Sequence, residues 1–174
     1  YKRVGTHQDG RGKTPGVRNR SGLWRSFDWV PYEADDADLD RWSNMGAGTG
    51  VKTGNGLVAI DADTQDENSA RIIRDTIAQH IGPCPIRVGN YPKALYLVRT
   101  SEPYRYTRID FGQRKDNGSF TDRVEILSDG RQFVAEGIHP KTGKPYAWPA
   151  QIVPYAELPI FSALQLDELL RALK

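Results

Sequence analysis

Two aspartates separated by one residue, Asp61 and Asp63, end an apolar run that begins at Leu57. In a β-strand, residues i and i+2 point to the same face, so both carboxylates are expected to lie side by side. Two like charges held this close raise each other's proton affinity unless a cation lies between them. A hard divalent ion prefers such oxygen ligands and can bridge the phosphates of a nucleotide. The pair therefore predicts a metal site for phosphate chemistry, with capping of the following helix as the alternative.

A two-metal site for phosphoryl transfer needs a third carboxylate, and Glu125 is the natural candidate. It lies among β-branched residues in an apolar run, where a charge is costly unless its face is a site or is open to solvent. Asp110, Asp122 and Asp129 fit less well, because they fall near predicted strand ends or turns. An exposed strand position without a function is the competing interpretation for Glu125.

The elements that must position these acids follow from periodicity and turn residues. The Gly-rich segment 46–56 predicts turns or strands that another backbone or the phosphates of a ligand approach closely. After the strand 57–63, apolar residues at spacings of three and four predict a helix over 66–80. Further strands are expected at 86–88, 94–98, 123–127 and 132–136. The last two are expected to pair through a turn at 128–130. The pattern is that of an α+β domain with a largely antiparallel sheet.

Length and composition limit the class of protein. The chain of 174 residues is 38% hydrophobic and 26% charged, which is typical of one globular domain. No apolar run approaches the ~20 residues needed to cross a bilayer, and no signal-peptide core follows the N-terminus. A single cysteine, Cys84, excludes an internal disulfide and agrees with a reducing compartment. We therefore expect a soluble cytoplasmic protein without a membrane partner.

Charge is unevenly distributed along the chain. The formal net charge of +2 is too small to indicate nucleic-acid binding by itself. Near the N-terminus, however, a single acid, Asp9, stands among many cations: Lys2, Arg3, Arg11, Lys13, Arg18, Arg20 and Arg25. This stretch predicts either a basic face or a solvated arm, because glycines and Pro15 interrupt it.

Both ends of the sequence are typical of a piece of a longer chain. There is no initiator methionine, and residues 162–174 predict a helix with a capping box at its start and no stop signal at its end. We expect a catalytic domain over residues 1–160. Residues 161–174 are then expected to begin a C-terminal helix that leads into a downstream region.

Two segments carry a family resemblance. The segment 50–63, Gly-Val-Lys-Thr-Gly-Asn-Gly-Leu-Val-Ala-Ile-Asp-Ala-Asp, resembles the first motif of the primase-polymerase domain family. This family, the N-terminal domain of bifunctional DNA primase/polymerases, is part of the archaeo-eukaryotic primase superfamily of phage, plasmid and prophage replication proteins. The segment 124–148 resembles the family's closing signature, in which an acidic strand residue precedes a glycine turn, a hydrophobic strand and a His-Pro-x-Thr-Gly-x-Pro-Tyr-x-Trp element. The likeness extends from about Lys13 to Trp148.

The resemblance implies a function and a fold. Asp61, Asp63 and Glu125 would be the catalytic residues of a template-directed nucleotidyltransferase and would bind Mg²⁺ or Mn²⁺. The implied fold is an RNA-recognition-like sheet with an added αβ unit, and the active site would lie in the cleft between them. The implied partners are a DNA template and primer, deoxynucleoside or ribonucleoside triphosphates, and a covalently linked helicase region. The implied setting is a bacterial or phage-infected cell.

One position departs from the family pattern. Many members carry a strand histidine in a Gly-Gly-x-His-Leu-Tyr setting that helps to hold the incoming nucleotide, and here Ala94 falls at about that place. Lys93 is expected to meet the triphosphate as a point charge, with Arg87 or Arg99 assisting. The alternative is that these cations are solvated residues at a strand edge.

Four further residues near the motifs receive an interpretation. Lys52, in the Gly-rich segment, is assigned to nucleotide binding. His139 is expected to contact a nucleotide phosphate or sugar, with a structural role in a turn as the alternative. Tyr146 and Trp148 are interpreted as packing residues, with stacking on a base as the alternative.

Other functions fit parts of the sequence. A non-catalytic module that binds template or nucleotide beside a helicase accounts for the missing histidine. A metal-dependent nucleotide-sugar transferase also uses Asp-x-Asp, but it leaves the closing signature unexplained. One large class of metal nucleases is disfavoured, because no lysine stands two residues after Glu125.

Overall fold

The computed structural model describes residues 3–6, 13 and 15–174 of the chain. Its elements in chain order are β1 (Arg3–Thr6), β2 (Val17–Arg18), β3 (Trp24–Arg25), α1 (Asp36–Asn44), β4 (Gly48–Lys52), β5 (Leu57–Asp63), α2 (Glu67–Ile81), β6 (Ile86–Asn90), β7 (Lys93–Thr100), β8 (Thr107–Arg114), β9 (Phe120–Leu127), β10 (Gln132–Glu136), η1 (Tyr155–Glu157), β11 (Ile160–Phe161) and α3 (Ala163–Ala172). Within the described part of the chain, no helix is long and apolar enough to cross a membrane.

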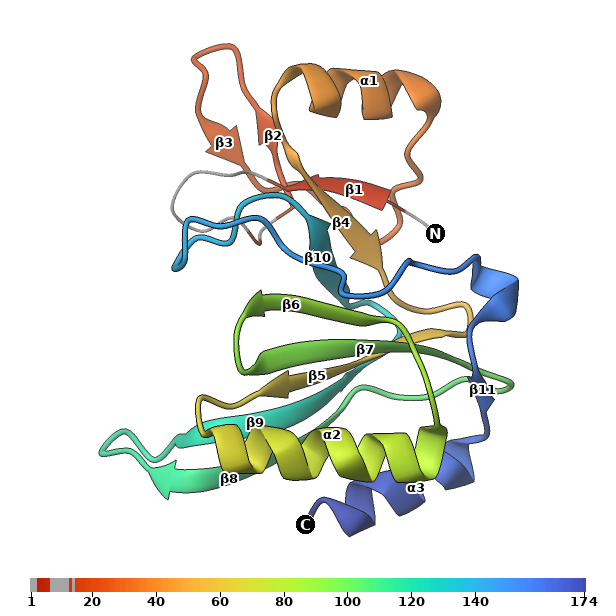
Figure 1. The fold of residues 1–174 in the computed structure, drawn as a ribbon. Helices are drawn as coiled ribbons and strands as arrows, with labels where there is room; N and C mark the ends of the chain where they lie inside the picture. Colours follow the sequence, from red (N-terminus) through yellow and green to blue (C-terminus); the bar gives the residue numbers. More distant parts are fainter. Residues whose placement is uncertain (1–2, 7–12, 14) are drawn as a thin grey trace.

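The main sheet has six strands, and β5 lies in its middle (Figure 1). The strand order is β11-β7-β5-β9-β8, and β6 pairs with β7 at the side. The pairs of β5 with β7 and β9, of β6 with β7 and of β8 with β9 are antiparallel, whereas β11 runs parallel to β7. The predicted α+β class with a largely antiparallel sheet is therefore confirmed.

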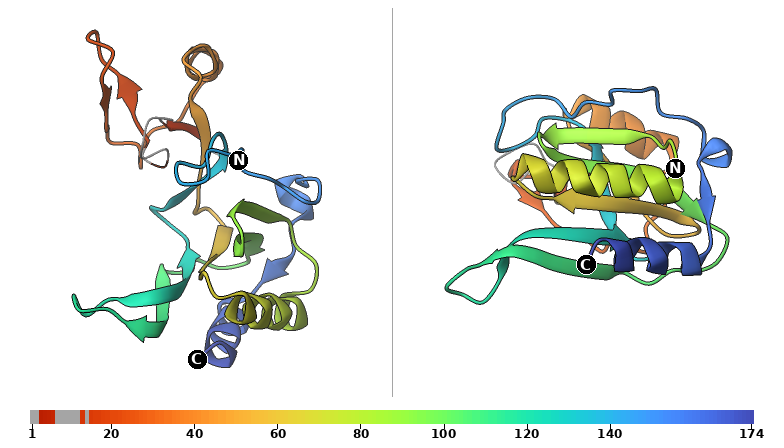
Figure 2. Two further views of the ribbon diagram at one scale, coloured as in Figure 1. Left: turned by 60° about the vertical axis from the view of Figure 1, so that its left-hand side comes forward. Right: turned by 60° about the horizontal axis from the view of Figure 1, so that its bottom comes forward.

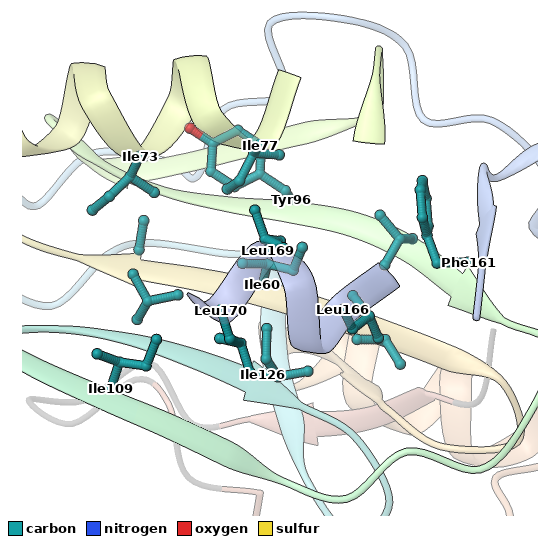
Figure 3. Packing of buried hydrophobic residues seen from close by; sticks show 14 of the residues in the cluster. Ile60, Ile73, Ile77, Tyr96, Ile109, Ile126, Phe161, Leu166, Leu169 and Leu170 are labelled. Carbon is teal, nitrogen blue, oxygen red and sulfur yellow. The ribbon is translucent and has the colours of Figure 1, made fainter. Parts of the chain in front are cut away.

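Helices α2 and α3 cover one face of this sheet and lie side by side across it (Figure 2). Alternate residues of β5 point into this layer, where they join apolar residues of the two helices and the neighbouring strands (Figure 3). The most deeply buried large side chains are Val58, Ile60, Val98, Val124, Ile126, Ile77, Leu166 and Leu169. Full burial of one such side chain stabilises the fold by about 1.5–3 kcal/mol, so this cluster is the main core.

Helix boundaries follow local capping chemistry. The side chain of Asp66 accepts a hydrogen bond from the backbone N–H of Ser69 and so begins α2. Gly82, with a positive φ of 77°, ends it. Ser162 begins α3 through a capping box with Gln165, as the sequence predicts. Three leucines of α3 are buried in the core of the same sheet, so this last helix packs as part of the domain.

The opposite face of the main sheet meets a second layer (Figure 1). Here a three-stranded sheet of order β1-β4-β10 packs on it, and a second apolar cluster joins the two. Leu57 and Ala59 of β5 point into this cluster, together with Val51 of β4 and Phe133 of β10. Strand β5 is therefore apolar on both faces for most of its length. Only its last residues on this second face are charged.

The partner of β10 differs from the sequence expectation. We expected 132–136 to form a hairpin with 123–127, and this was wrong: β10 pairs with β4, with Phe133 opposite Val51. Strand β9 already lies between β5 and β8, so it offers β10 no edge. The loop instead bonds to the end of β4, where the Thr53 N–H donates to the Arg131 carbonyl at 3.0 Å.

Strand β8 was missed by the sequence analysis, which predicts no strand between 98 and 123. In the structure β8 forms a long hairpin with β9 that projects from the body of the domain (Figure 2). Along β8 only Ile109 is buried, and Phe111 packs partly against the core. Because so little of the strand is apolar, its hydrophobic pattern is too weak to predict it.

Candidate active site

The three predicted acids lie together on one face of the main sheet. Asp61 of β5 is directly opposite Glu125 of β9, and Asp63 is opposite Arg123. Side chains alternate along a strand, so all four point away from α2 and α3 and toward the second layer. Directly paired residues have Cβ atoms about 4.5–5.5 Å apart. The register therefore makes these side chains close neighbours.

Each carboxylate has a cationic or hydroxyl partner. Asp63 is bonded to the ammonium of Lys93 and to Arg123, whose Nη2 lies 2.9 Å from Oδ2. The hydroxyl of Tyr106 donates to Oε1 of Glu125 at 2.6 Å, and Arg123 Nε lies 2.8 Å from Oε2. Asp61 has a looser partner, because Arg87 Nη2 is 3.8 Å from its Oδ1. The acids are thus embedded among cations, as expected where like charges converge.

The two aspartates differ in their proton affinity. Burial raises the pKa of Asp61; Arg87 and Lys13 oppose this rise, whereas the neighbouring Asp63 adds to it. Burial also acts to raise the pKa of Asp63, but the hydrogen bond and charge of Lys93, helped by Arg123, hold that pKa below its usual value. Asp61 is therefore the acid of the pair whose charge is less well compensated.

A small pocket of about 90 Å³ adjoins the aspartates. Its wall combines the acids with cations and with residues from β6 and the turn after β10: Lys13, Asp61, Asp63, Arg87, Gly89, Asn90, Lys93, Ala94, Arg123, His139 and Tyr146. The volume is that of about three water molecules, which suits a phosphate group or a hydrated ion and not a whole nucleotide. A nucleotide bound here would extend beyond it.

The turn after β10 forms one side of this pocket by packing closely on β6. His139 accepts a return hydrogen bond from the N–H of Gly143, and its own N–H donates to Lys144, which closes the predicted turn. The ring of Tyr146 lies against Gly89, where a Cβ would approach Cδ1 of the ring to 2.6 Å. Only glycine leaves room for the ring at this position.

His139 is held in one tautomer. Its Nδ1 lies 3.3 Å from the backbone nitrogens of both Lys141 and Thr142, and it accepts from their N–H groups. Burial lowers the pKa of His139, and the nearby cations Lys13 and Arg87 lower it further. The ring is therefore neutral at pH 7 and carries its proton on Nε2. This N–H is the group that His139 can offer to a ligand.

Three buried polar atoms of the pocket residues lack hydrogen-bond partners among the described residues. These are Nε of Arg87, Nε of Arg123 and the hydroxyl of Tyr146. The Arg87 guanidinium lies over the Tyr146 ring, 4.7 Å from its centroid, and each residue is less than one-tenth exposed. Buried polar groups are normally satisfied, so unpaired donors in a cationic pocket fit an anionic ligand such as a phosphate.

Other predicted residues lie elsewhere. The ammonium of Lys52 is bonded to backbone carbonyls of the segment 29–32, among them Val30 at 3.0 Å, and Lys52 does not line the pocket. Its assignment to nucleotide binding stays a prediction. Arg99 lies near the far end of β7, where Nε donates to the Leu158 carbonyl at 3.0 Å. The indole N–H of Trp148 donates to the Ala135 carbonyl, and this residue packs in the second cluster, as predicted.

The residue that falls at about the place of the family histidine lines the pocket, but its side chain points to the helix-side core. Ala94 is opposite Ala62 and packs against the helix-side core. Its neighbour Lys93 points to the other face and reaches Asp63. The cation that this strand presents to the acids is therefore Lys93, and its expected contact with a triphosphate stays a prediction.

Larger hollows exist away from the acids. One of about 340 Å³ lies at the opposite end of β5, beside Leu57 and Tyr155. Another of about 570 Å³ lies between α2 and the β6–β7 hairpin, lined by Arg71 and Tyr91 among others. Neither contains the acidic cluster. We place the candidate site at the smaller pocket because the chemically distinctive residues converge there.

The side chains of the site are of the type that binds a divalent cation, but they are not arranged to hold one. Three carboxylates on one surface are the donor set that Mg²⁺ or Mn²⁺ prefers. Across the described residues, however, no group of three or more acidic, histidine or cysteine side chains stands ready to hold a metal. The guanidinium of Arg123 contacts carboxylate oxygens of Asp63 and Glu125 that a metal would use.

Sequence reasoning missed two contributors to the site. Arg123 stands two residues before Glu125, and this spacing could have placed it on the same strand face. Tyr106 carries no such signal, because it directly precedes strand β8, which was not predicted, and its bond to Glu125 depends on the pairing of β8 with β9. Of the basic N-terminal residues, Lys13 lines the pocket, whereas Lys2 and Arg11 lie outside the described residues.

Fold and site together define an α+β protein whose central strands present acids and cations to one pocket. The family model for the N-terminal domain of bifunctional DNA primase/polymerases matches residues 14–160. The chain therefore belongs to this primase-polymerase family. Membership supports a nucleotidyltransferase function of the primase or polymerase type, with nucleic acid and nucleotides as substrates. A search of curated proteins found no match.

Proposed function

We propose that this domain extends or primes a nucleic-acid strand on a DNA template, by a two-metal mechanism that uses Asp61, Asp63 and Glu125. The observation that carries the proposal is the cross-strand pair of Asp61 and Glu125, with Asp63 on the same face and a cationic pocket beside it. The phage, prophage or plasmid setting, the bacterial cytoplasm and a linked helicase region belong to the same proposal and rest on the family resemblance alone.

The chain's own residues have distinct roles in this mechanism. The three carboxylates would hold the metal ions, and Tyr106 fixes the orientation of Glu125 through its hydroxyl. When bound, Mg²⁺ or Mn²⁺ lowers the pKa of the attacking hydroxyl and neutralises charge on the triphosphate. Arg87 offers its unpaired Nε to a phosphate oxygen. The Nε2–H of His139 donates a hydrogen bond to a phosphate or sugar oxygen.

Lys93 completes the phosphate pocket. Its ammonium is bonded to Asp63 and lines the same small cavity as Arg87. With Asp63 as a metal ligand, Lys93 would be able to pair with the triphosphate, because a compact ammonium on a flexible stem can exchange partners readily. This gives the pocket a cation at the place where the family histidine is missing.

The test is primer extension with labelled nucleotides in Mn²⁺. The double variant Asp61→Asn/Asp63→Asn should lose about a hundredfold or more of its activity, because transition-state charge is no longer neutralised. Asp116→Asn, at the exposed tip of the β8–β9 hairpin, is the matched control and should retain full activity. Circular dichroism checks that the variants fold. Undiminished extension by the double variant would end the proposal.

A second function, a non-catalytic nucleotide-binding or template-binding module, has one observation in its favour. Arg123 and Lys93 neutralise the acids by direct contact. A cluster neutralised in this way is also what a binding domain without metal chemistry would show. This alternative predicts nucleotide or DNA binding by the wild type without extension in Mn²⁺ or Mg²⁺. It also predicts that the double variant binds as tightly as the wild type.

A further inference from the structure

Four side chains form a square on the face of the sheet that points away from α2 and α3, and one of the four is a cation. Asp61 and Asp63 occupy two corners on β5, and Glu125 and Arg123 the other two on β9. The guanidinium reaches straight across to β5 and along its own strand, contacting Oδ2 of Asp63 at 2.9 Å and Oε2 of Glu125 at 2.8 Å. It therefore lies between two carboxylates that would otherwise repel each other.

The contacts of Arg123 are suited to exchange. Its Nε is close to Glu125 but has no aligned hydrogen bond among the described residues, so that contact is mainly one of charge. The side chain is 38% exposed, so it can move toward solvent without burying a charge. If Arg123 moves away, Asp63 still has its ion pair with Lys93, and Glu125 still has its hydrogen bond from Tyr106.

We infer that Arg123 is a resident cation, which holds the acidic cluster together in the metal-free protein and which a divalent ion must displace to bind. The inference rests on the proposed function, since it assumes that the acids bind metal. The guanidinium of Arg123 contacts oxygens of both Asp63 and Glu125, which are the same oxygens that would hold a metal. Arg123 therefore weakens metal affinity while it keeps the ligands in place.

Direct measurement of Mn²⁺ binding tests this, by electron paramagnetic resonance or calorimetry on the whole chain without nucleotide. Arg123→Gln should bind Mn²⁺ about tenfold more tightly than the wild type. That factor follows from Coulomb's law for a unit charge roughly 6 Å from a divalent ion in a water-like dielectric. Arg123→Lys keeps the charge and should stay within about threefold of the wild type. Arg71→Gln, on the exposed surface of α2, is the control for removing any arginine.

Thermal unfolding gives a second readout that does not depend on activity. Without metal, Arg123→Gln should unfold at a lower temperature than the wild type, because two acids lose a partner. Added Mn²⁺ should then raise its unfolding temperature more than that of the wild type, since tighter binding stabilises the folded state more. Arg71→Gln should show the wild-type response.

The outcomes separate this inference from the proposed function. Tighter binding by Arg123→Gln, with Arg123→Lys near the wild type, supports it. If the wild type binds Mn²⁺ through Asp61 but Arg123→Gln binds equally or more weakly, the resident-cation role is overturned and the proposed function stands. Equal gains in Arg123→Gln and Arg123→Lys also overturn it, because charge would then not be the cause. If neither protein binds Mn²⁺, both ideas fail.

Discussion

Gly89→Ala tests how closely the turn after β10 packs on β6. The new Cβ would lie 2.6 Å from Cδ1 of Tyr146 and 2.9 Å from Cδ2 of His139. Ordinary carbon contacts are about 3.5–4.0 Å, so the Tyr146 ring must move by about 1 Å. Gly89 is not among the glycines with a positive φ, so an alanine meets no backbone strain here.

The expected cost follows from these contacts. Overpacking a close-packed site costs about 1–3 kcal/mol, and the lower chain entropy of alanine in the unfolded state returns about 0.4–1 kcal/mol. We therefore expect Gly89→Ala to lower the free energy of unfolding by about 1–2 kcal/mol. Because Arg87 lies over the Tyr146 ring, nucleotide affinity should fall as well.

A double-mutant cycle in urea separates the clash from other effects. In a Tyr146→Ala background the ring is absent, and Gly89→Ala should then cost almost nothing. Gly130→Ala is the contrasting control: no atom lies within 4 Å of its Cβ, but its φ of 72° is unfavourable for alanine. Its cost of about 1–2 kcal/mol should not depend on Tyr146. Additive costs for Gly89→Ala and Tyr146→Ala, within about 0.5 kcal/mol, would refute the packing argument.

Two further predictions concern stability. Leu169→Ala removes a fully buried side chain of α3 and should lower the free energy of unfolding in urea by about 2–5 kcal/mol, whereas Leu164→Ala, 60% exposed, should change it by less than about 0.5 kcal/mol. A hydrogen bond from Tyr32 holds the pKa of Asp38 below its usual value, helped by Arg41. The stability from this shift is complete above the unfolded pKa of about 3.9 and is lost as pH falls through the lower folded pKa. The stability advantage of the wild type over Asp38→Asn should therefore shrink below about pH 4, and a constant advantage would contradict it.

The sequence was sufficient to predict the central strand and to predict which of its residues share a face. In β5, the alternation that puts Ile60 into the helix-side core also puts Asp61 on the opposite face. A charge at the end of such an apolar run is costly unless a site uses it, and this physical constraint is visible in sequence alone. The same constraint identified Glu125, which the structure brings opposite Asp61.

Partner choice between distant strands was beyond sequence reasoning. Residues 132–136 follow a tight turn, and a local rule makes them a hairpin with the preceding strand. The pairing of β10 with β4 instead depends on β8, which occupies the free edge of β9. Because β8 is mostly polar, the strand whose pairing decides the topology has almost no hydrophobic pattern in the sequence. Non-local pairing is settled by the whole sheet and not by one segment.

The positions of the cations around the acids could not be predicted from the sequence either. These positions explain how the acidic cluster can form. Three carboxylates converging on one surface would raise the free energy of folding if nothing compensated them. Lys93 and Arg123 come from the strands on either side of β5, and each forms an ion pair with Asp63. The acids can therefore be assembled by the fold itself, before any ligand arrives. A site built in this way has its ligands positioned in advance, and what remains for a metal or nucleotide is to exchange one cation for another.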